Sequence, residues 1–83
     1  MYVYLVEFYV VNSDDVRFDR GAEIYDSWDK ADMAVNEFKN ECIKQGYSSR
    51  YDVAWSDSSR QVALLDESDN LNYHASLTRF EVK

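Results

Sequence analysis

Residues 2–11 (YVYLVEFYVV) constrain the fold more than any other stretch, because they are apolar at both odd and even positions. Neighbouring side chains of a β-strand point to opposite faces of the sheet, so a strand with a single buried face alternates apolar and polar residues. The even positions supply the core-facing set, which is Tyr2, Tyr4, Val6, Phe8 and Val10. The odd positions are largely apolar too, so we expect a central strand whose second face also needs a cover.

Two arrangements account for this second face. In the first, loops and tyrosine side chains of the same chain close it. In the second, it forms an interface, either in a homodimer or with another protein, through the apolar residues Val3, Leu5, Tyr9 and Val11. Glu7 lies among them, and a carboxylate buried without a partner is costly. We therefore expect Glu7 to be semi-exposed or to face a cross-strand arginine such as Arg79.

A second strand returns along the first. The turn cluster NSDD (residues 12–15) separates the two and predicts a hairpin with residues 16–25. Arg20 breaks the apolar alternation of this returning strand, and Gly21 follows it directly. A break in alternation beside a glycine is typical of a β-bulge, so we expect one at this position.

The stretch DSWDKADMAVNEFKNECIKQG (residues 26–46) predicts the one helix. Asp26 or Ser27 can cap its first turn, and Gly46 suits the left-handed residue that stops it. Its apolar residues recur at three- and four-residue spacing, as on the buried face of a helix; they are Trp28, Ala31, Val35, Phe38 and Cys42, with Ala34 and Ile43 beside them. The remaining face is expected to be wet and carries Lys30, Glu37, Lys39, Asn40 and Glu41.

Three further strands complete the chain, around residues 51–55, 60–66 and 71–82, with polar turns between them. In the last strand the apolar parity switches between Leu77 and Phe80, which predicts a bulge near Thr78 or Arg79. The sequence therefore predicts one α+β domain over residues 1–83, with β-β-α-β-β-β order. Its single, mostly antiparallel sheet of about five strands carries one helix on one face.

Charge is the strongest global signal. The chain carries 16 acidic and 9 basic residues, a net charge of −7, so it repels nucleic acid and anionic membranes and attracts basic protein surfaces. Acids spaced along the hairpin and the helix start favour imitation of phosphate groups on a partner that handles nucleic acid; these are Asp14, Asp15, Asp19, Glu23, Asp26 and Asp29. The competing interpretation is that acidity only keeps a small protein soluble.

Residues suited to catalysis or metal binding are few. Cys42 lies on the core stripe of the helix, so we do not expect it to act as a nucleophile. His74 lies on a polar strand face, and we do not expect it to act as a catalytic base. Two glycines cannot build a phosphate loop, and the oxygen-rich turn at residues 66–70 lacks the pattern of a calcium loop. We expect no enzyme activity, no cofactor and no metal. One cysteine and no apolar leader or membrane-spanning run favour a cytoplasmic protein.

The stretch EIYDSWDKADMAVNEF, after the strand YVYLVEFYV, resembles small α/β proteins of phages and their hosts, in which a hairpin leads into an S-x-x-K-A helix. Ser27, Lys30 and Ala31 fit that pattern, and the likeness covers roughly residues 1–45. The resemblance implies the class of anti-CRISPR and other host-defence inhibitors, which act by stoichiometric binding in the host cytoplasm. The leading hypothesis is thus a non-enzymatic acidic inhibitor of a nucleic-acid-handling or defence complex. The alternative is a homodimeric module built on the first strand.

Overall fold

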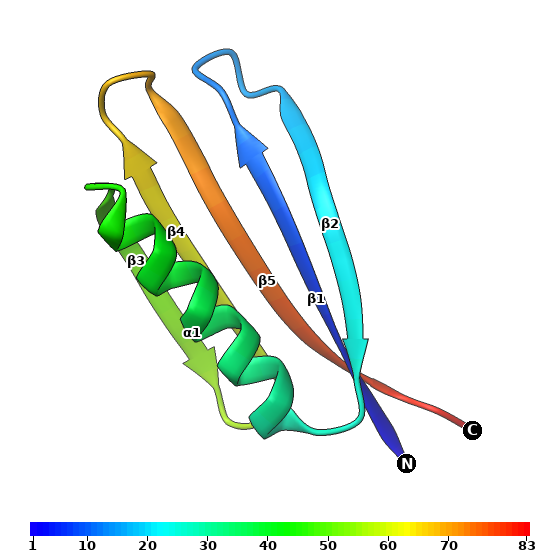
Figure 1. Ribbon diagram of the computed structural model, residues 1–83. Coiled ribbons are helices and arrows are strands. Elements are labelled where there is room, and N and C mark those ends of the chain that lie inside the picture. The colour runs from blue at the N-terminus through cyan, green and yellow to red at the C-terminus, as the bar shows by residue number, and fades with distance from the viewer.

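The computed structural model describes all residues, 1–83, and contains a five-stranded antiparallel sheet with one helix on one face (Figure 1). This confirms the predicted α+β fold and the predicted order of elements. In chain order these are β1 (Tyr2–Val11), β2 (Arg17–Tyr25), α1 (Trp28–Lys44), β3 (Ser48–Trp55), β4 (Ser59–Asp66) and β5 (Leu71–Glu81).

The strands lie in the order β2-β1-β5-β4-β3. The hairpin β1–β2 and the meander β3–β4–β5 are joined where β1 pairs with β5 along its whole length. β1 is therefore internal, with a neighbour on each side, although β5 occupies the centre. β2 and β3 are the edge strands, and each has one row of backbone groups without a strand partner.

Strand registers confirm one predicted bulge and contradict the other. Phe8 pairs with Gly21 and Tyr9 with Asp19, which leaves Arg20 as the extra residue of a bulge in β2. In contrast, β5 pairs residue by residue with β1 from Asn72 to Glu81, so the bulge predicted near Thr78 or Arg79 is absent. The parity switch has another cause, because Phe80 points to the opposite sheet face from Leu77 and lies beside Val3.

The ends of α1 follow from local chemistry. Ser27 is the N-cap, and its hydroxyl accepts a hydrogen bond from the Lys30 backbone N–H at 3.3 Å. Asp26, the other candidate cap, instead forms an ion pair with the Lys30 ammonium at 2.9 Å. Gly46 has a φ of 89° and ends the helix in the left-handed conformation, as predicted. This helix lacks both the length and the apolar character needed to cross a lipid bilayer.

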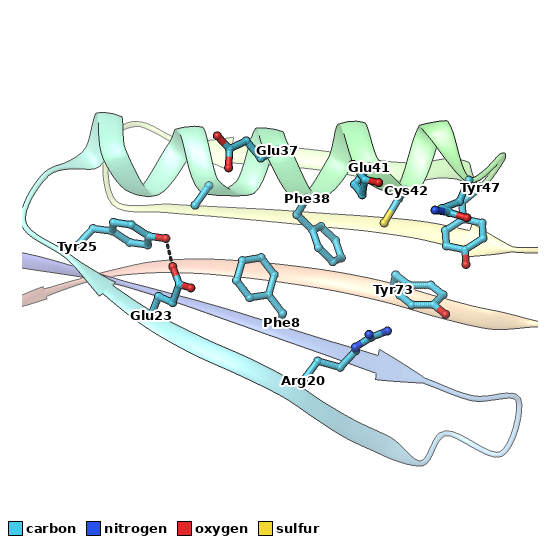
Figure 2. Close-up of a pocket in the computed structure, with 12 residues that line it drawn as sticks. Phe8, Arg20, Glu23, Tyr25, Glu37, Phe38, Glu41, Cys42, Tyr47 and Tyr73 are labelled. Carbon is cyan, nitrogen blue, oxygen red and sulfur yellow. Dashed lines mark hydrogen bonds between the residues drawn. The ribbon is translucent and has the colours of Figure 1, made fainter.

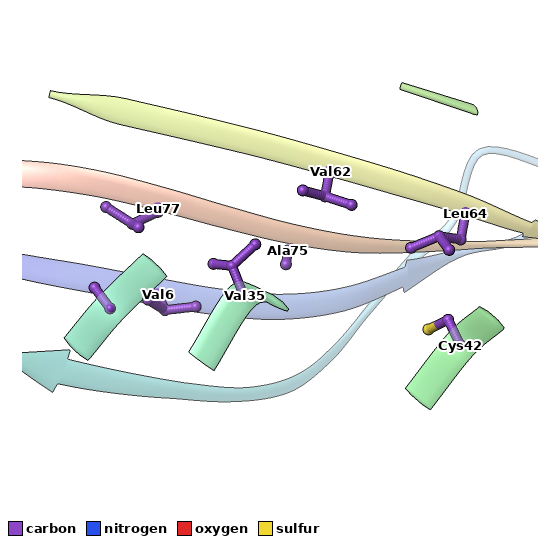
Figure 3. Close-up of a cluster of buried hydrophobic side chains, with 8 residues drawn as sticks. Val6, Val35, Cys42, Val62, Leu64, Ala75 and Leu77 are labelled. Carbon is purple, nitrogen blue, oxygen red and sulfur yellow. The ribbon is translucent and has the colours of Figure 1, made fainter. Parts of the chain in front are cut away.

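The core lies between α1 and one face of the sheet. Its buried side chains come from the helix, β1, β4 and β5 (Figure 3); they are Val6, Ala31, Val35, Cys42, Val62, Leu64, Ala75 and Leu77. Trp28 and Phe38 flank this cluster, each in contact with an aromatic ring of β1. The predicted stripe of α1 is thus confirmed, except that Ile43 is about half exposed and does not widen it.

A buried arginine binds the helix to the β3–β4 hairpin, which the sequence interpretation missed. Arg60 donates to Asp52 at 2.7 and 2.9 Å, to Asp32 at 2.6 Å and to the Asn36 side chain at 2.8 Å. Lys39 also pairs with Asp52 at 2.9 Å, so its predicted place on the wet side is wrong. Every buried side-chain polar atom has a partner, so this network anchors α1 without leaving an unpaired buried charge.

Candidate functional site

The six acids singled out from the sequence follow the β2 edge of the molecule and do not gather into one cluster. All are exposed. Asp14 and Asp15 lie in the β1–β2 turn, whereas Asp26 and Asp29 lie near the start of α1, at the other end of β2. β2 has nine residues and spans about 27 Å. We call the set Asp14, Asp15, Asp19, Glu23, Asp26 and Asp29 the acidic edge.

Half of the acidic edge has no ionic or hydrogen-bonding partner. Asp19 pairs with Arg17 at 2.8 Å, and Asp26 pairs with Lys30. Glu23 accepts a hydrogen bond from the Tyr25 hydroxyl, and this bond raises the pKa of Tyr25 to about 12. The carboxylates that form neither an ion pair nor a side-chain hydrogen bond are Asp14, Asp15 and Asp29. They are the members of the edge most free to meet a partner's cations.

A groove of about 670 Å³ lies between α1 and β2, because the helix does not cover the β2 side of the sheet (Figure 2). Its floor is aromatic. Phe8 and Phe38 point toward each other with ring centroids 5.1 Å apart, and Tyr47 stacks on Tyr73 at 4.9 Å. A hydrogen bond to Tyr73 and partial burial raise the pKa of Tyr47 to about 12, so the Tyr47 phenol stays neutral at physiological pH.

The rim of this groove is acidic. Glu37 and Glu41 extend from α1, and Glu23 and Arg20 extend from β2 on the other side (Figure 2). Glu37 and Glu41 form no ion pair, and neither does Arg20, whose guanidinium lies 5.8 Å from the centre of the Tyr73 ring. The rim thus carries three carboxylates and one arginine around an aromatic floor.

The second sheet face, which we call the open face, carries no helix or loop (Figure 1). No loop of the same chain closes this face, so that part of the first cover considered above is absent, although Tyr9 and Tyr51 pack against His74 on it. The strand registers place one row of side chains across all five strands: Trp55, Ser59, Thr78, Leu5 and Ile24. Ile24 is 70% exposed, Trp55 52% and Phe80, next to this row, 49%. The end of the open face near the two termini is therefore apolar and uncovered.

The predicted apolar set of β1 lies on this open face, and each member is half-buried by its neighbours; the set is Val3, Leu5, Tyr9 and Val11. Tyr9 lies between two other side chains. Its ring stacks on His74 with centroids 4.7 Å apart, and the Arg17 guanidinium lies 3.9 Å from its centre. Arg17 is also the partner of Glu7, at 3.4 Å. Glu7 is thus semi-exposed and beside a cross-strand arginine, as expected, but that arginine is Arg17 and not Arg79, which packs against Tyr2.

The surroundings of His74 and Cys42 keep both side chains uncharged. Burial and the nearby Arg17 and Arg50 lower the pKa of His74, which therefore stays neutral at physiological pH. Burial raises the pKa of the Cys42 thiol and keeps it protonated. The structure also brings together no group of three or more His, Cys, Asp or Glu side chains that could hold a metal ion.

Sequence reasoning missed the groove, although part of its signal was present. Glu37 and Glu41 are four residues apart and flank Phe38, so they project from the helix on the side of the groove. What the sequence could not supply is the strand order, which brings β2 beside this face of α1. Arg60 also had a signal, because it shares the parity of the buried Val62 and Leu64 in β4.

Comparison with protein-family models, with curated proteins and with solved structures finds no match to this chain. Function must therefore be inferred from the acidic edge, the groove and the open face. Each is a surface feature suited to binding, and each is built from exposed or half-buried side chains that the fold itself leaves uncovered.

Proposed function

We propose that the protein is a non-catalytic binding module that occupies a basic, nucleic-acid-binding surface of a partner protein. The observation that carries this proposal is the uneven placement of charge. Two positive charges near β3 are neutralised within the fold, because Arg60 and Lys39 pair with Asp32 and Asp52, whereas Arg50 forms no ion pair. Along the β2 edge the acids outnumber the bases, and Asp14, Asp15 and Asp29 have no cation of their own.

Stoichiometric binding explains how such a surface would act. Carboxylates spread along about 27 Å of edge strand present negative charge at intervals, as a nucleic-acid backbone does. A protein that holds this edge in its nucleic-acid channel is blocked without any chemical step. The N-terminal resemblance to small phage inhibitors, on Ser27, Lys30 and Ala31, supports the same mode of action.

The proposal is tested by affinity capture from a bacterial lysate, followed by quantitative mass spectrometry. The edge variant carries Asp14→Asn, Asp15→Asn and Asp29→Asn. Its matched control carries Asp57→Asn, Glu67→Gln and Asp69→Asn, which remove the same charge from exposed turns. We expect the wild type and the control to capture a nucleic-acid-binding protein that the edge variant does not capture. Added duplex DNA should displace this protein from the wild type. Equal capture by all three proteins would reject the proposal.

A second candidate function, homodimerisation through the open face, is favoured by the exposed row that contains Trp55, Leu5 and Ile24. Burying such residues against a second sheet would cover their apolar surface. The measurement is solution mass by light scattering at several concentrations. A dimer of wild type that becomes a monomer on Ile24→Asp supports this candidate, whereas a monomer at high concentration rejects it.

A further inference from the structure

The groove between α1 and β2 combines two features that select one kind of ligand group. Its floor is formed by the rings of Phe8, Phe38 and Tyr73, all half-buried, which favour aliphatic or aromatic groups. Its volume of about 670 Å³ lies within the range of pockets that hold small ligands or a few side chains. The floor alone would accept any apolar segment.

The rim favours cations, because its three carboxylates outnumber its single arginine, Arg20. Glu37 and Glu41 are one helical turn apart, and like charges at this spacing destabilise a helix. Glu23 faces them from β2, and no ion pair relieves Glu23, Glu37 or Glu41 (Figure 2). A positive group placed between the helix and β2 would be attracted by all three carboxylates.

Lysine and arginine side chains match both features. Their methylene stems can lie on Phe8 and Phe38 while the charged head reaches the glutamates at the rim. An aromatic face also attracts a nearby cation, and Arg20 already lies over Tyr73 in this way. Carboxylate–guanidinium and carboxylate–ammonium hydrogen bonds are the stronger class of hydrogen bond in proteins.

We propose that this groove binds a short segment of the partner protein in which lysine or arginine alternates with apolar residues. The inference rests on the proposed function and names the part of the partner that is recognised. The acidic edge attracts the partner at long range, and the groove holds one basic segment of it in contact. Glu37 and Glu41 then act as the residues that select the cation, with Phe38 beneath it.

The test is an NMR titration of the labelled protein with an acetylated, amidated peptide of three Lys-Leu repeats. A peptide of three Gln-Leu repeats is the uncharged control. We expect saturable amide shifts confined to the residues around Phe8, Phe38 and Tyr73. Glu37→Gln with Glu41→Gln should weaken binding by about tenfold, whereas Asp57→Asn with Asp69→Asn should weaken it less than about twofold.

Two results would overturn the inference: equal weakening by both double variants, or unsaturated shifts spread along the acidic edge. Neither result bears on the capture experiment, which uses Asp14, Asp15 and Asp29 and leaves the groove intact. If capture still depends on the acidic edge but the peptide does not bind in the groove, the proposed function stands and the groove inference fails. If capture is independent of the edge, the proposed function fails whatever the peptide does.

Discussion

At the scale of single residues, Arg60 shows how one buried charge connects elements that are separate in the sequence. Its side chain is 10% exposed and donates to Asp32 on α1 and to Asp52 on β3. The guanidinium therefore joins the helix to the β3–β4 hairpin, where an apolar residue would leave Asp32 without a cation and Asp52 with Lys39 alone. Hydrogen bonds from Arg60 hold the pKa of Asp52 at about 2, below its ordinary value of 3.8.

This pKa predicts how stability depends on pH. Because the folded pKa of Asp52 is lower than the unfolded one, its ionised form stabilises the fold above pH 4, and that contribution is lost as the pH falls from about 4 to 2. Asp52→Asn should therefore cost about 1–2 kcal/mol near neutral pH, after allowance for partial solvent screening.

Urea unfolding from pH 6 down to pH 2 measures this effect, with Asp57→Asn as the exposed control. The difference in unfolding free energy between wild type and Asp52→Asn should shrink toward pH 2. A difference that is constant over this range, or a control that behaves like Asp52→Asn, would contradict the proposed role of the ion pair.

At the scale of elements, α1 holds the fold together through one side and exposes the other. Val35 is fully buried against the sheet, whereas Asn40 is exposed. Val35→Ala should lower the unfolding free energy by about 2 kcal/mol, because it leaves a cavity between the helix and the sheet. That is a large share of the total for a domain of 83 residues, about 4–12 kcal/mol.

Thermal or urea unfolding of Val35→Ala and Asn40→Ala checks the register of the helix. Asn40→Ala should change stability by less than about 0.5 kcal/mol. Lys39, one position before it, is unsuitable as a neutral control because it pairs with Asp52. Similar losses in both variants would show that the packed side of α1 has been misassigned.

Local patterns predicted the elements better than they predicted contacts between elements. The apolar stripe of α1 and the break at Arg20 depend on residues that are close in sequence, and both predictions are confirmed. The switch between Leu77 and Phe80 was misread as a bulge, because a strand with two apolar faces gives the same pattern. The buried role of Arg60 was not predicted, since its partner on the helix, Asp32, lies 28 residues away in the sequence.

At the scale of the whole molecule, the sheet separates two kinds of surface. The helix side carries the groove with its acidic rim, and the open face carries the exposed row that includes Trp55 and Ile24. The acidic edge runs along β2 between them. This separation could not be predicted from sequence, because it depends on the strand order that places β2 at one edge and β3 at the other.

The association rate with the captured partner tests the central claim most directly, measured by surface plasmon resonance between about 50 and 300 mM salt. If the acidic edge steers binding, association should slow steeply with added salt while dissociation changes much less, and the variant at Asp14, Asp15 and Asp29 should associate slowly throughout. The claim would be contradicted if binding stayed tight at all salt concentrations, persisted in the variant with the neutralised edge, and was lost on Tyr9→Ala. Recognition would then be assigned to the open face.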